Sequence, residues 1–146
     1  MLRMYTDAST RSNPGPSGAG VIFIGNGIHI QLAFPLEKEM SNHQAEFEAV
    51  LSGLNYLIAN QLAHHELVIY SDSNIVVSAI ERNYVKNPLF NEYLFSINKR
   101  LKLFPSFMIQ WISETQNKEA DHFARQALHK RLKSSYSTNK KTKKED

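Results

Sequence analysis

Apolar and polar residues recur along the chain with two different periods, and these periods predict its secondary structure. Short runs rich in β-branched and aromatic residues predict strands at residues 2–6, 19–24, 28–34, 67–70 and 107–112. Apolar residues at helical spacing predict helices that follow Ser41, begin near Asn74, cover residues 88–103 and follow Asn117 as a cap. Ser41 and Gln44 fit a capping box, which marks the first helix start.

The order of these elements, β-β-β-α-β-α-α-β-α, predicts the α/β class. Gly25-Asn26-Gly27 is a typical hairpin turn, so the first three strands form an antiparallel meander. The later strands enter through βαβ crossovers, and we expect one mixed five-stranded sheet with helices on both faces. Residues 1–133 suit a single domain, and we expect residues 134–146 to form a basic, disordered tail.

Composition narrows the class of protein. No apolar run approaches the roughly 20 residues that a membrane span needs, and Asp7 interrupts any signal-peptide pattern at the N-terminus. The 146 residues include no cysteine, which excludes disulfides and thiolate metal sites. We therefore expect a cytoplasmic monomer with no membrane and no obligate protein partner.

The positive charge is concentrated at the C-terminal end. Residues 130–146 contain seven Lys and Arg against two acids, whereas residues 1–129 contain ten against twelve. The slightly acidic domain argues against a broad basic face for nucleic acid. The tail could add a nonspecific grip on phosphates, but a solubilising end is the simpler interpretation.

Two aspartates lie where strands rarely place them. Asp7 follows Met4-Tyr5-Thr6 within or at the end of the first strand, and Asp72 follows the strand at residues 67–70. Asp is depleted in strands, and the carboxyl edge of an open α/β sheet is where ligands bind. A role for Asp72 as the cap of the next helix is an equally good explanation of that residue alone.

Two further acids lie at the margins of apolar helix faces. Glu46 falls beside the apolar stripe of its helix, whereas Glu48 is expected to face solvent. Asp121 lies near the start of the last helix, where it suits the helix dipole and can pair with Arg125. Each of these residues also has an ordinary surface explanation.

Together the four carboxylates favour a metal site. Acids held close together repel one another unless divalent cations lie between them, and hard oxygen ligands select Mg²⁺ or Mn²⁺. Two such ions about 4 Å apart activate a water and stabilise a leaving oxygen in phosphodiester hydrolysis. His64-His65 offer a different metal site, but we expect this pair in a solvated loop.

Four segments of the sequence resemble the signature blocks of the type 1 ribonuclease H family: YTDASTRSNPGPSGAGVIF, SNHQAEFEAVLSGL, IYSDSNIVV and WISETQNKEADHFARQAL. The resemblance covers about residues 3–130. It is closest to the short-loop branch, since no basic protrusion fits between Arg82 and Pro88. It implies endonucleolytic cleavage of the RNA strand of RNA/DNA hybrids with two Mg²⁺ or Mn²⁺ ions, leaving 3′-hydroxyl and 5′-phosphate ends.

The resemblance also implies roles for individual residues. The metal-binding catalytic acids would be Asp7, Glu46, Asp72 and Asp121, with Asp7 shared by both ions. The family's substrate-contacting positions match Ala8, Ser9, Asn13, Ser41, Asn42 and His43. Among these, Ser9 and Asn13 would lie near RNA 2′-hydroxyls, Asn42 and His43 would reach into the minor groove, and Ser41 would bind a DNA-strand phosphate.

Two departures from the family pattern affect the expected activity. Ala8 stands where the family often has Gly, and the alanine side chain adds only a methyl group. Glu114 stands where the short-loop branch often has an Arg that assists product release, and its negative charge predicts turnover slower by about a hundredfold. A catalytically weak or inactive module that binds nucleic acid or protein is therefore an alternative, and an exonuclease is another. Ser41-Asn42-His43 favour hybrid recognition over the exonuclease.

Overall fold

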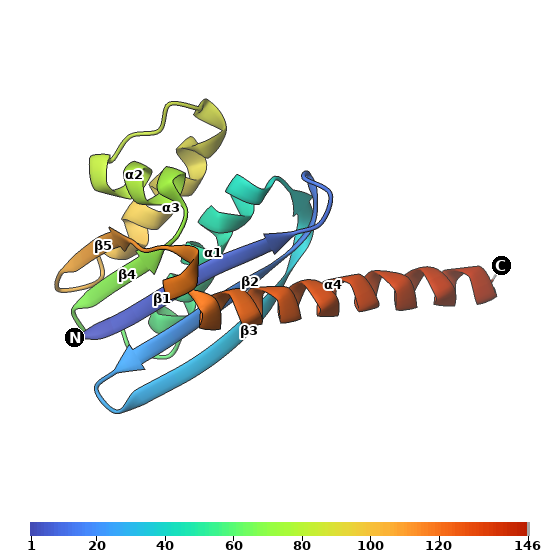
Figure 1. The fold of residues 1–146 in the computed structure, drawn as a ribbon, viewed down its shortest axis with the longest axis horizontal. Coiled ribbons are helices and arrows are strands. Elements are labelled where there is room, and N and C mark those ends of the chain that lie inside the picture. The colour runs from blue at the N-terminus through green and yellow to red at the C-terminus, as the bar shows by residue number, and fades with distance from the viewer. Residues whose placement is uncertain (146) are drawn as a thin grey trace.

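The chain folds around one five-stranded sheet with helices on both faces, as Figure 1 shows. The computed structural model describes the backbone of residues 1–145 and the side chains of residues 1–134. The strands are β1 (Leu2–Thr10), β2 (Gly15–Gly25), β3 (Ile28–Met40), β4 (Leu67–Ser71) and β5 (Phe107–Trp111). The helices are α1 (Asn42–Ala59), α2 (Asn74–Arg82), α3 (Asn91–Leu101) and α4 (Lys118–Glu145), with single turns η1 (Pro88–Phe90) and η2 (Glu114–Gln116). The predicted class and element order are confirmed.

The strand register brings two of the predicted acids to the same edge of the sheet. The strand order is β3-β2-β1-β4-β5, in which β1 pairs antiparallel with β2 and parallel with β4. The last pair of the β1–β4 ladder is Thr6 with Ser71. Asp7 and Asp72 are the next residues on their strands, so they lie side by side beyond the end of the ladder.

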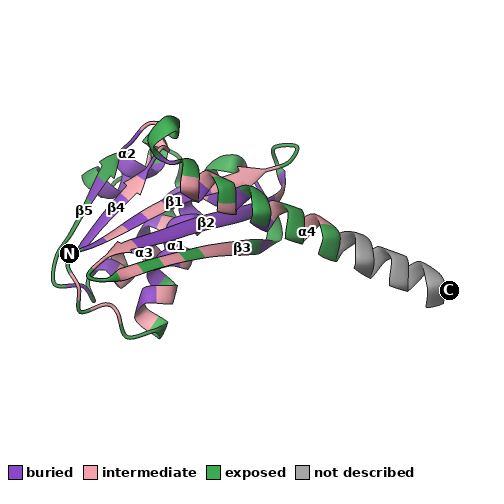
Figure 2. Ribbon diagram, turned by 60° about the horizontal axis from the view of Figure 1, so that its bottom comes forward, coloured by how far each residue is buried: buried purple, intermediate pink, exposed green. Residues whose placement is uncertain are grey.

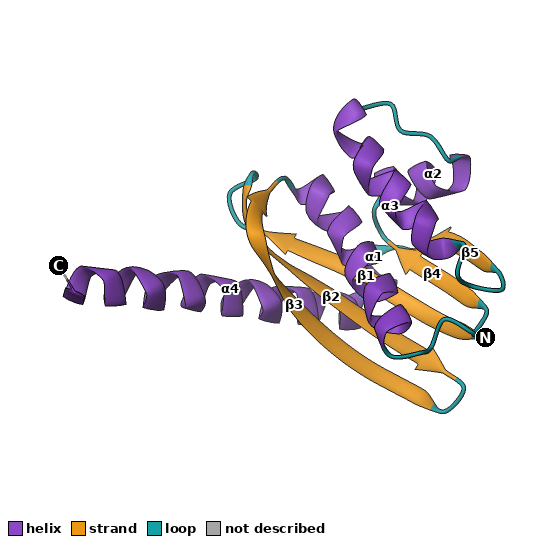
Figure 3. Ribbon diagram, turned by 180° about the vertical axis from the view of Figure 1, so that it is seen from behind, coloured by secondary structure: helices purple, strands orange, loops and turns teal. Residues whose placement is uncertain are grey.

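Helices cover the two faces unequally. α1, α2 and α3 lie over one face and α4 over the other, which is clear in Figure 3. The main hydrophobic core lies under α1, where side chains such as Met4, Phe23, Phe47, Leu54 and Ile69 are fully buried. Figure 2 shows the buried residues concentrated along β2 and β4. Burial of each large side chain contributes roughly 1.5–3 kcal/mol to folding, which fixes the sheet that carries the acids.

Glycines in β2 let α4 approach the sheet closely. A Cβ atom at Gly20 would lie 2.1 Å from the Ala120 carbonyl oxygen, and one at Gly18 would lie 2.3 Å from the Leu128 amide nitrogen. Neither distance is compatible with a side chain, so both positions require glycine. β2 begins at Gly15, before these two glycines, although its Gly- and Pro-rich start resembles a turn in the sequence.

The helix starts explain which polar side chains are available for function. Ser41 and Gln44 form the predicted capping box, in which the Ser41 hydroxyl accepts from the Gln44 amide at 3.1 Å. Ser73, and not Asp72, caps α2. Asn117 precedes the last helix as predicted, and its carbonyl accepts from the Asp121 amide at 3.1 Å, but its side chain makes no capping bond, because its carboxamide nitrogen donates to the Thr6 carbonyl at 2.8 Å and its carboxamide oxygen has no partner.

Glu48 does not face open solvent as predicted. It is half-buried, and burial raises the pKa of its carboxyl above the usual range. The helical pattern placed Glu48 away from the sheet, but α3 packs against α1, and the Tyr93 ring of α3 stacks on Phe47 at 5.5 Å. A second helix therefore covers part of the face that sequence periodicity assigned to solvent.

Two further predictions concern the C-terminal tail and membrane-spanning helices. The structure describes the backbone of residues 134–145 as the end of α4, whereas the side chains beyond residue 134 lie outside the described residues, and the predicted disordered tail at residues 134–146 stays a prediction. Among the residues that the structure describes, no helix combines the length and hydropathy that crossing a membrane requires.

Candidate active site

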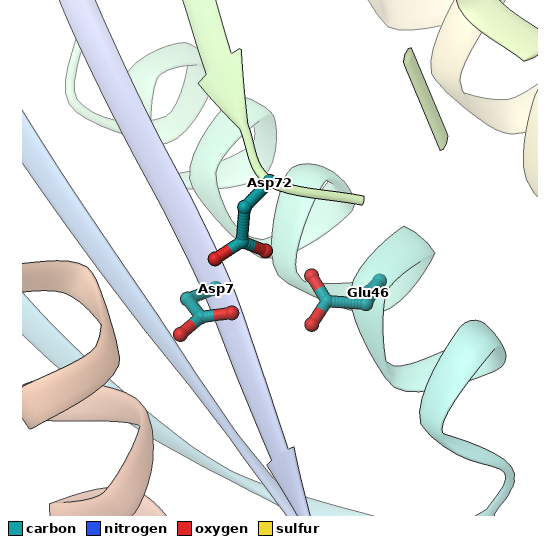
Figure 4. A group of neighbouring side chains, drawn as sticks. All are labelled: Asp7, Glu46 and Asp72. Carbon is teal, nitrogen blue, oxygen red and sulfur yellow. The ribbon is translucent and has the colours of Figure 1, made fainter. Parts of the chain in front are cut away.

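Three acids from three different elements converge beyond the end of the β1–β4 ladder. Asp7 lies in β1 and is only 6% exposed, Asp72 follows β4, and Glu46 lies on α1. Figure 4 shows their carboxylates pointing toward one another. One oxygen from each lies within 4.8 Å of the others. The sheet register places the two aspartates, and the capping box at Ser41 fixes the start of the helix that presents Glu46.

The same acids line a small cavity. Its volume is about 220 Å³, and its lining residues are Asp7, Ala8, Glu46, Asp72, Glu114, Asp121 and Arg125. Asp121 reaches this cavity from the first turn of α4, on the opposite face of the sheet from α1. The fold therefore brings all four predicted acids to one cavity, with the close triad inside it and Asp121 completing its wall.

Backbone and side-chain contacts hold the acids in place. The Ala8 amide donates to Glu46 Oε1 at 3.2 Å, which ties β1 to α1. The Trp111 indole nitrogen donates to the Asp72 backbone carbonyl at 3.1 Å, which ties the end of β4 to β5. Glu46 Oε2, in contrast, is buried without a hydrogen-bond partner. An anionic oxygen left in this state is unfavourable unless a cation or a proton neutralises it.

Burial and mutual repulsion raise the proton affinity of these acids. Burial, followed by the charge of Asp72, raises the pKa of Asp7 to about 7. Burial, followed by the charge of Asp7, raises the pKa of Glu46 well above its usual range. The pKa of Asp72 is raised as well, first by burial and further by the charges of Glu114 and Asp121, although a hydrogen bond with the Asn117 side chain acts in the opposite direction. The site therefore holds more negative charge than it can stabilise by itself at neutral pH.

The donor set fits a hard divalent cation. All the converging ligand atoms are carboxylate oxygens, the buried Glu46 Oε2 has no other partner, and the raised pKa values report uncompensated negative charge. Oxygen-only sites of this kind suit Mg²⁺ and Mn²⁺. Among the residues with described side chains, only Asp7, Glu46 and Asp72 form a group of three or more potential ligands. His64 and His65 lie in the turn after α1 and contact each other instead.

Two charged residues at the cavity wall have opposite signs. Glu114, from η2, lines the cavity and adds negative charge near Asp72. Arg125 lines it as well, and its Nε lies 3.2 Å from an Asp121 carboxylate oxygen, which is the ion pair that the sequence predicts. Nothing in the sequence pattern places Arg125 in the cavity itself. Its only signal is the spacing of four residues from Asp121 on α4.

The predicted substrate-contacting residues group around the start of α1. The Asn13 carboxamide oxygen accepts from the Asn42 amide at 3.0 Å, so the β1–β2 turn touches the first turn of α1. Asn13, Asn42 and His43 are exposed, and the His43 ring packs edge-on against Phe90. Ala8 lines the acidic cavity, and Ser9 is the next residue of β1. Polar residues of the β1–β2 turn and of the start of α1 thus lie together, in the same part of the fold as β1, which also contributes Ala8 to the cavity.

The position of Ser41 leaves part of its hydrogen-bonding capacity available. Its hydroxyl oxygen accepts from the Gln44 amide as the helix cap. The hydroxyl hydrogen remains able to donate to an anion, since a serine hydroxyl is both donor and acceptor. Capping α1 and contacting a phosphate oxygen are therefore compatible roles.

Comparison with known proteins finds the same fold and similar sequences. Residues 5–127 match the reverse transcriptase-like family. EbsB of Enterococcus faecalis, provisionally named a hydrolase, is 45% identical over 130 residues, which are 89% of this chain and 96% of that protein. Ribonuclease H of Erythrobacter litoralis is 28% identical over 141 residues, with 86% and 94% of the two chains covered.

Solved structures support the architecture. The crystal structure of LC11-RNase H1 in complex with an RNA/DNA hybrid superposes with a TM-score of 0.81 at 28% identity, covering 90% of this chain and 99% of that one. RNase H1 of the archaeon Halobacterium salinarum has the same fold at 22% identity, with a TM-score of 0.79, covering 88% of this chain and 98% of that one.

Proposed function

The chain belongs to the reverse transcriptase-like family, and on this basis we propose that it is a metal-dependent ribonuclease H. The observation that carries the proposal is the convergence of Asp7, Glu46 and Asp72, with ligand oxygens within 4.8 Å of one another. The similarity to LC11-RNase H1, which was crystallised with an RNA/DNA hybrid, supports the substrate class. The proposed reaction is internal hydrolysis of the RNA strand, leaving 3′-hydroxyl and 5′-phosphate ends.

The acids are proposed to hold two divalent cations, Mg²⁺ or Mn²⁺. Asp7, Glu46, Asp72 and Asp121 would be the ligands, because they share one cavity and present only oxygen donors. When bound, such ions would supply a reactive water and stabilise the leaving oxygen. The chain itself contributes a rigid frame, since the β1–β4 register and the bond from the Ala8 amide to Glu46 fix the carboxylates before any ligand arrives.

Substrate recognition is proposed to follow the polar surface at the start of α1. A 2′-hydroxyl distinguishes RNA from DNA, and short polar side chains can contact it across a wide, shallow minor groove. Ser9 and Asn13 are proposed to contact the RNA strand, and the exposed Asn42 and His43 to reach the minor groove. The Ser41 hydroxyl would donate to a phosphate of the DNA strand.

A second candidate function follows from Glu114. This carboxylate lines the acidic cavity, where it raises the pKa of Asp72. Negative charge at the cavity wall opposes the approach of phosphates, so turnover is proposed to be slow. In the limiting case the domain is a catalytically weak or inactive module that binds nucleic acid or protein.

We further propose that the protein is a monomeric, cytoplasmic enzyme. All four acids come from one chain, so the proposed site needs no second subunit and no obligate protein partner. The sequence contains no cysteine, in keeping with a reducing compartment.

The test is cleavage of an end-labelled RNA/DNA hybrid in Mg²⁺ and in Mn²⁺, with double-stranded RNA and DNA as competitors. Internal cuts in the RNA of the hybrid alone, lost in Asp72→Asn, are the expected result. Glu48→Gln is the matched control, because it also neutralises a half-buried acid but one outside the cavity. A circular substrate separates an endonuclease from an exonuclease. Hybrid binding in EDTA without cleavage in either metal would favour the binding module.

A further inference from the structure

Buried polar side chains are concentrated at the edge of the cavity. Among the residues with described side chains, the buried polar ones are Thr6, Asp7, Ser17, Ser71 and Asn117. All but Ser17 lie at the end of the β1–β4 ladder. Asn117 is 2% exposed and is neither a proposed cation ligand nor a proposed substrate-contacting residue. A carboxamide is unfavourable in such a place unless its hydrogen bonds hold something in position.

Asn117 joins three segments that carry acids of the site. Its Nδ2 donates to the Thr6 carbonyl at 2.8 Å, one residue before Asp7 on β1. Its backbone carbonyl accepts from the Asp121 amide at 3.1 Å, and its own amide donates to the Glu114 carbonyl at 3.0 Å. β1 and the start of α4 are more than a hundred residues apart in sequence, so this one residue links distant parts of the cavity wall.

The bond to Thr6 forms where the sheet ladder stops. β1 and β4 pair only as far as Thr6 and Ser71, and at this last pair the Thr6 carbonyl accepts from the Asn117 carboxamide. Its orientation is fixed, because a reversed amide would set two oxygens against each other at 2.8 Å. The segment of β1 that carries Asp7 is thus held by the Asn117 side chain at the point where its pairing with β4 ends.

The Asn117 side chain does not make the capping hydrogen bond that would stabilise the start of α4. Asn immediately before a helix commonly accepts a hydrogen bond from a first-turn amide. Here the carboxamide oxygen is buried without any partner, and the nitrogen is directed at β1 instead. A residue chosen only to start α4 would use its oxygen as a cap.

We propose that Asn117 is a positioning residue, which sets the position of Asp7 relative to Asp121 so that both face one cavity. The inference rests on the proposed function, since the purpose of this geometry is to hold cations. Asn117 touches neither substrate nor cation in this role and acts through the Thr6 carbonyl of β1 and through its side-chain hydrogen bond to Asp72. Its loss should separate the acids and weaken cation binding without unfolding the domain.

The test compares Asn117→Ala with Ser17→Ala. Ser17 is fully buried in the same sheet and loses contacts to Thr10 and Gly15, so it matches the loss of a buried hydrogen bond away from the cavity. Isothermal titration with Mn²⁺ should show binding at least tenfold weaker for Asn117→Ala and unchanged for Ser17→Ala. Asn117→Ser, whose hydroxyl is too short to reach Thr6, replaces Asn117→Ala if that variant does not fold.

A second readout needs no metal. Amide exchange followed by NMR in EDTA should show faster exchange at Ala8, whose amide bonds to Glu46, in Asn117→Ala than in Ser17→Ala. Equal Mn²⁺ affinity and equal Ala8 exchange in the two variants would overturn the inference. A wild-type protein that binds no Mn²⁺ would refute the proposed function instead, and the exchange comparison would then decide the role of Asn117 alone.

Discussion

Replacement of Asp7 by Asn should make the metal-free protein more stable at alkaline pH. Asp7 is buried, and burial with the charge of Asp72 raises its pKa from 3.8 to about 7. The native state therefore keeps a proton on Asp7 that the unfolded chain releases, so wild-type stability falls as pH rises from about 4 to about 7. An Asn at this position does not titrate, and the variant escapes this loss.

The size of the effect follows from the pKa shift. Moving the pKa from 3.8 to about 7 corresponds to about 4 kcal/mol when the whole transition is crossed, at 1.36 kcal/mol per unit. Part of the transition is already complete at pH 5, and Glu46 shares the proton of the pair. We expect the stability difference between Asp7→Asn and wild type to grow by about 2 kcal/mol between pH 5 and pH 8.

The assay is urea unfolding followed by circular dichroism in EDTA at pH 5 and pH 8. Ser17→Ala is the control, because it removes a buried hydrogen bond in the same sheet without changing a titratable group. Its stability relative to wild type should change little between the two pH values. Saturating Mn²⁺ at pH 8 should restore wild type and leave Asp7→Asn unchanged. Parallel pH profiles for wild type and Asp7→Asn would refute the assigned burial and repulsion.

Three further outcomes test the site and its frame. Glu114→Arg should speed multiple-turnover cleavage, by up to about a hundredfold, with a smaller gain for Glu114→Gln; an unchanged or slower rate would remove Glu114 from the path of product release. Gly20→Ala should destabilise the fold by about 3 kcal/mol or more in urea unfolding, because its Cβ would lie 2.1 Å from the Ala120 carbonyl; native-like stability would show that α4 can move away. Ser41→Ala should lose about 1 kcal/mol by breaking the capping box with Gln44, whereas Ser41→Asp should retain most of it, and equal losses would mean that the cap is unimportant.

The sequence predicts the helices and the strands β4 and β5 well because their apolar patterns are clear. It underestimates β1, which was expected to end at Thr6 and runs to Thr10. The missed part carries Asp7 and Ser9. These are polar residues that the proposed site requires, and they interrupt the apolar pattern from which a strand is predicted. The start of β2 was missed for a related reason, since Gly18 is needed for the approach of α4 but resembles a turn residue.

The candidate site is predictable as far as its acids are concerned, and less so for its supporting residues. Each acid alone has a surface explanation, and only the strand register shows that Asp7 and Asp72 are neighbours. The open question of whether Asp72 caps α2 is answered by Ser73, which does so instead. The role of Asn117 has no local signal, because its side chain bonds to a strand at the other end of the sequence.

The bond from Trp111 to the Asp72 backbone carbonyl has a practical consequence. Trp111 is the only tryptophan in the chain, and its indole lies within hydrogen-bonding distance of the segment that carries Asp72. Its intrinsic fluorescence therefore comes from a single, known position beside the acidic cavity. The protein carries a built-in optical probe, through which cation or nucleic-acid titrations can be followed without attaching a dye.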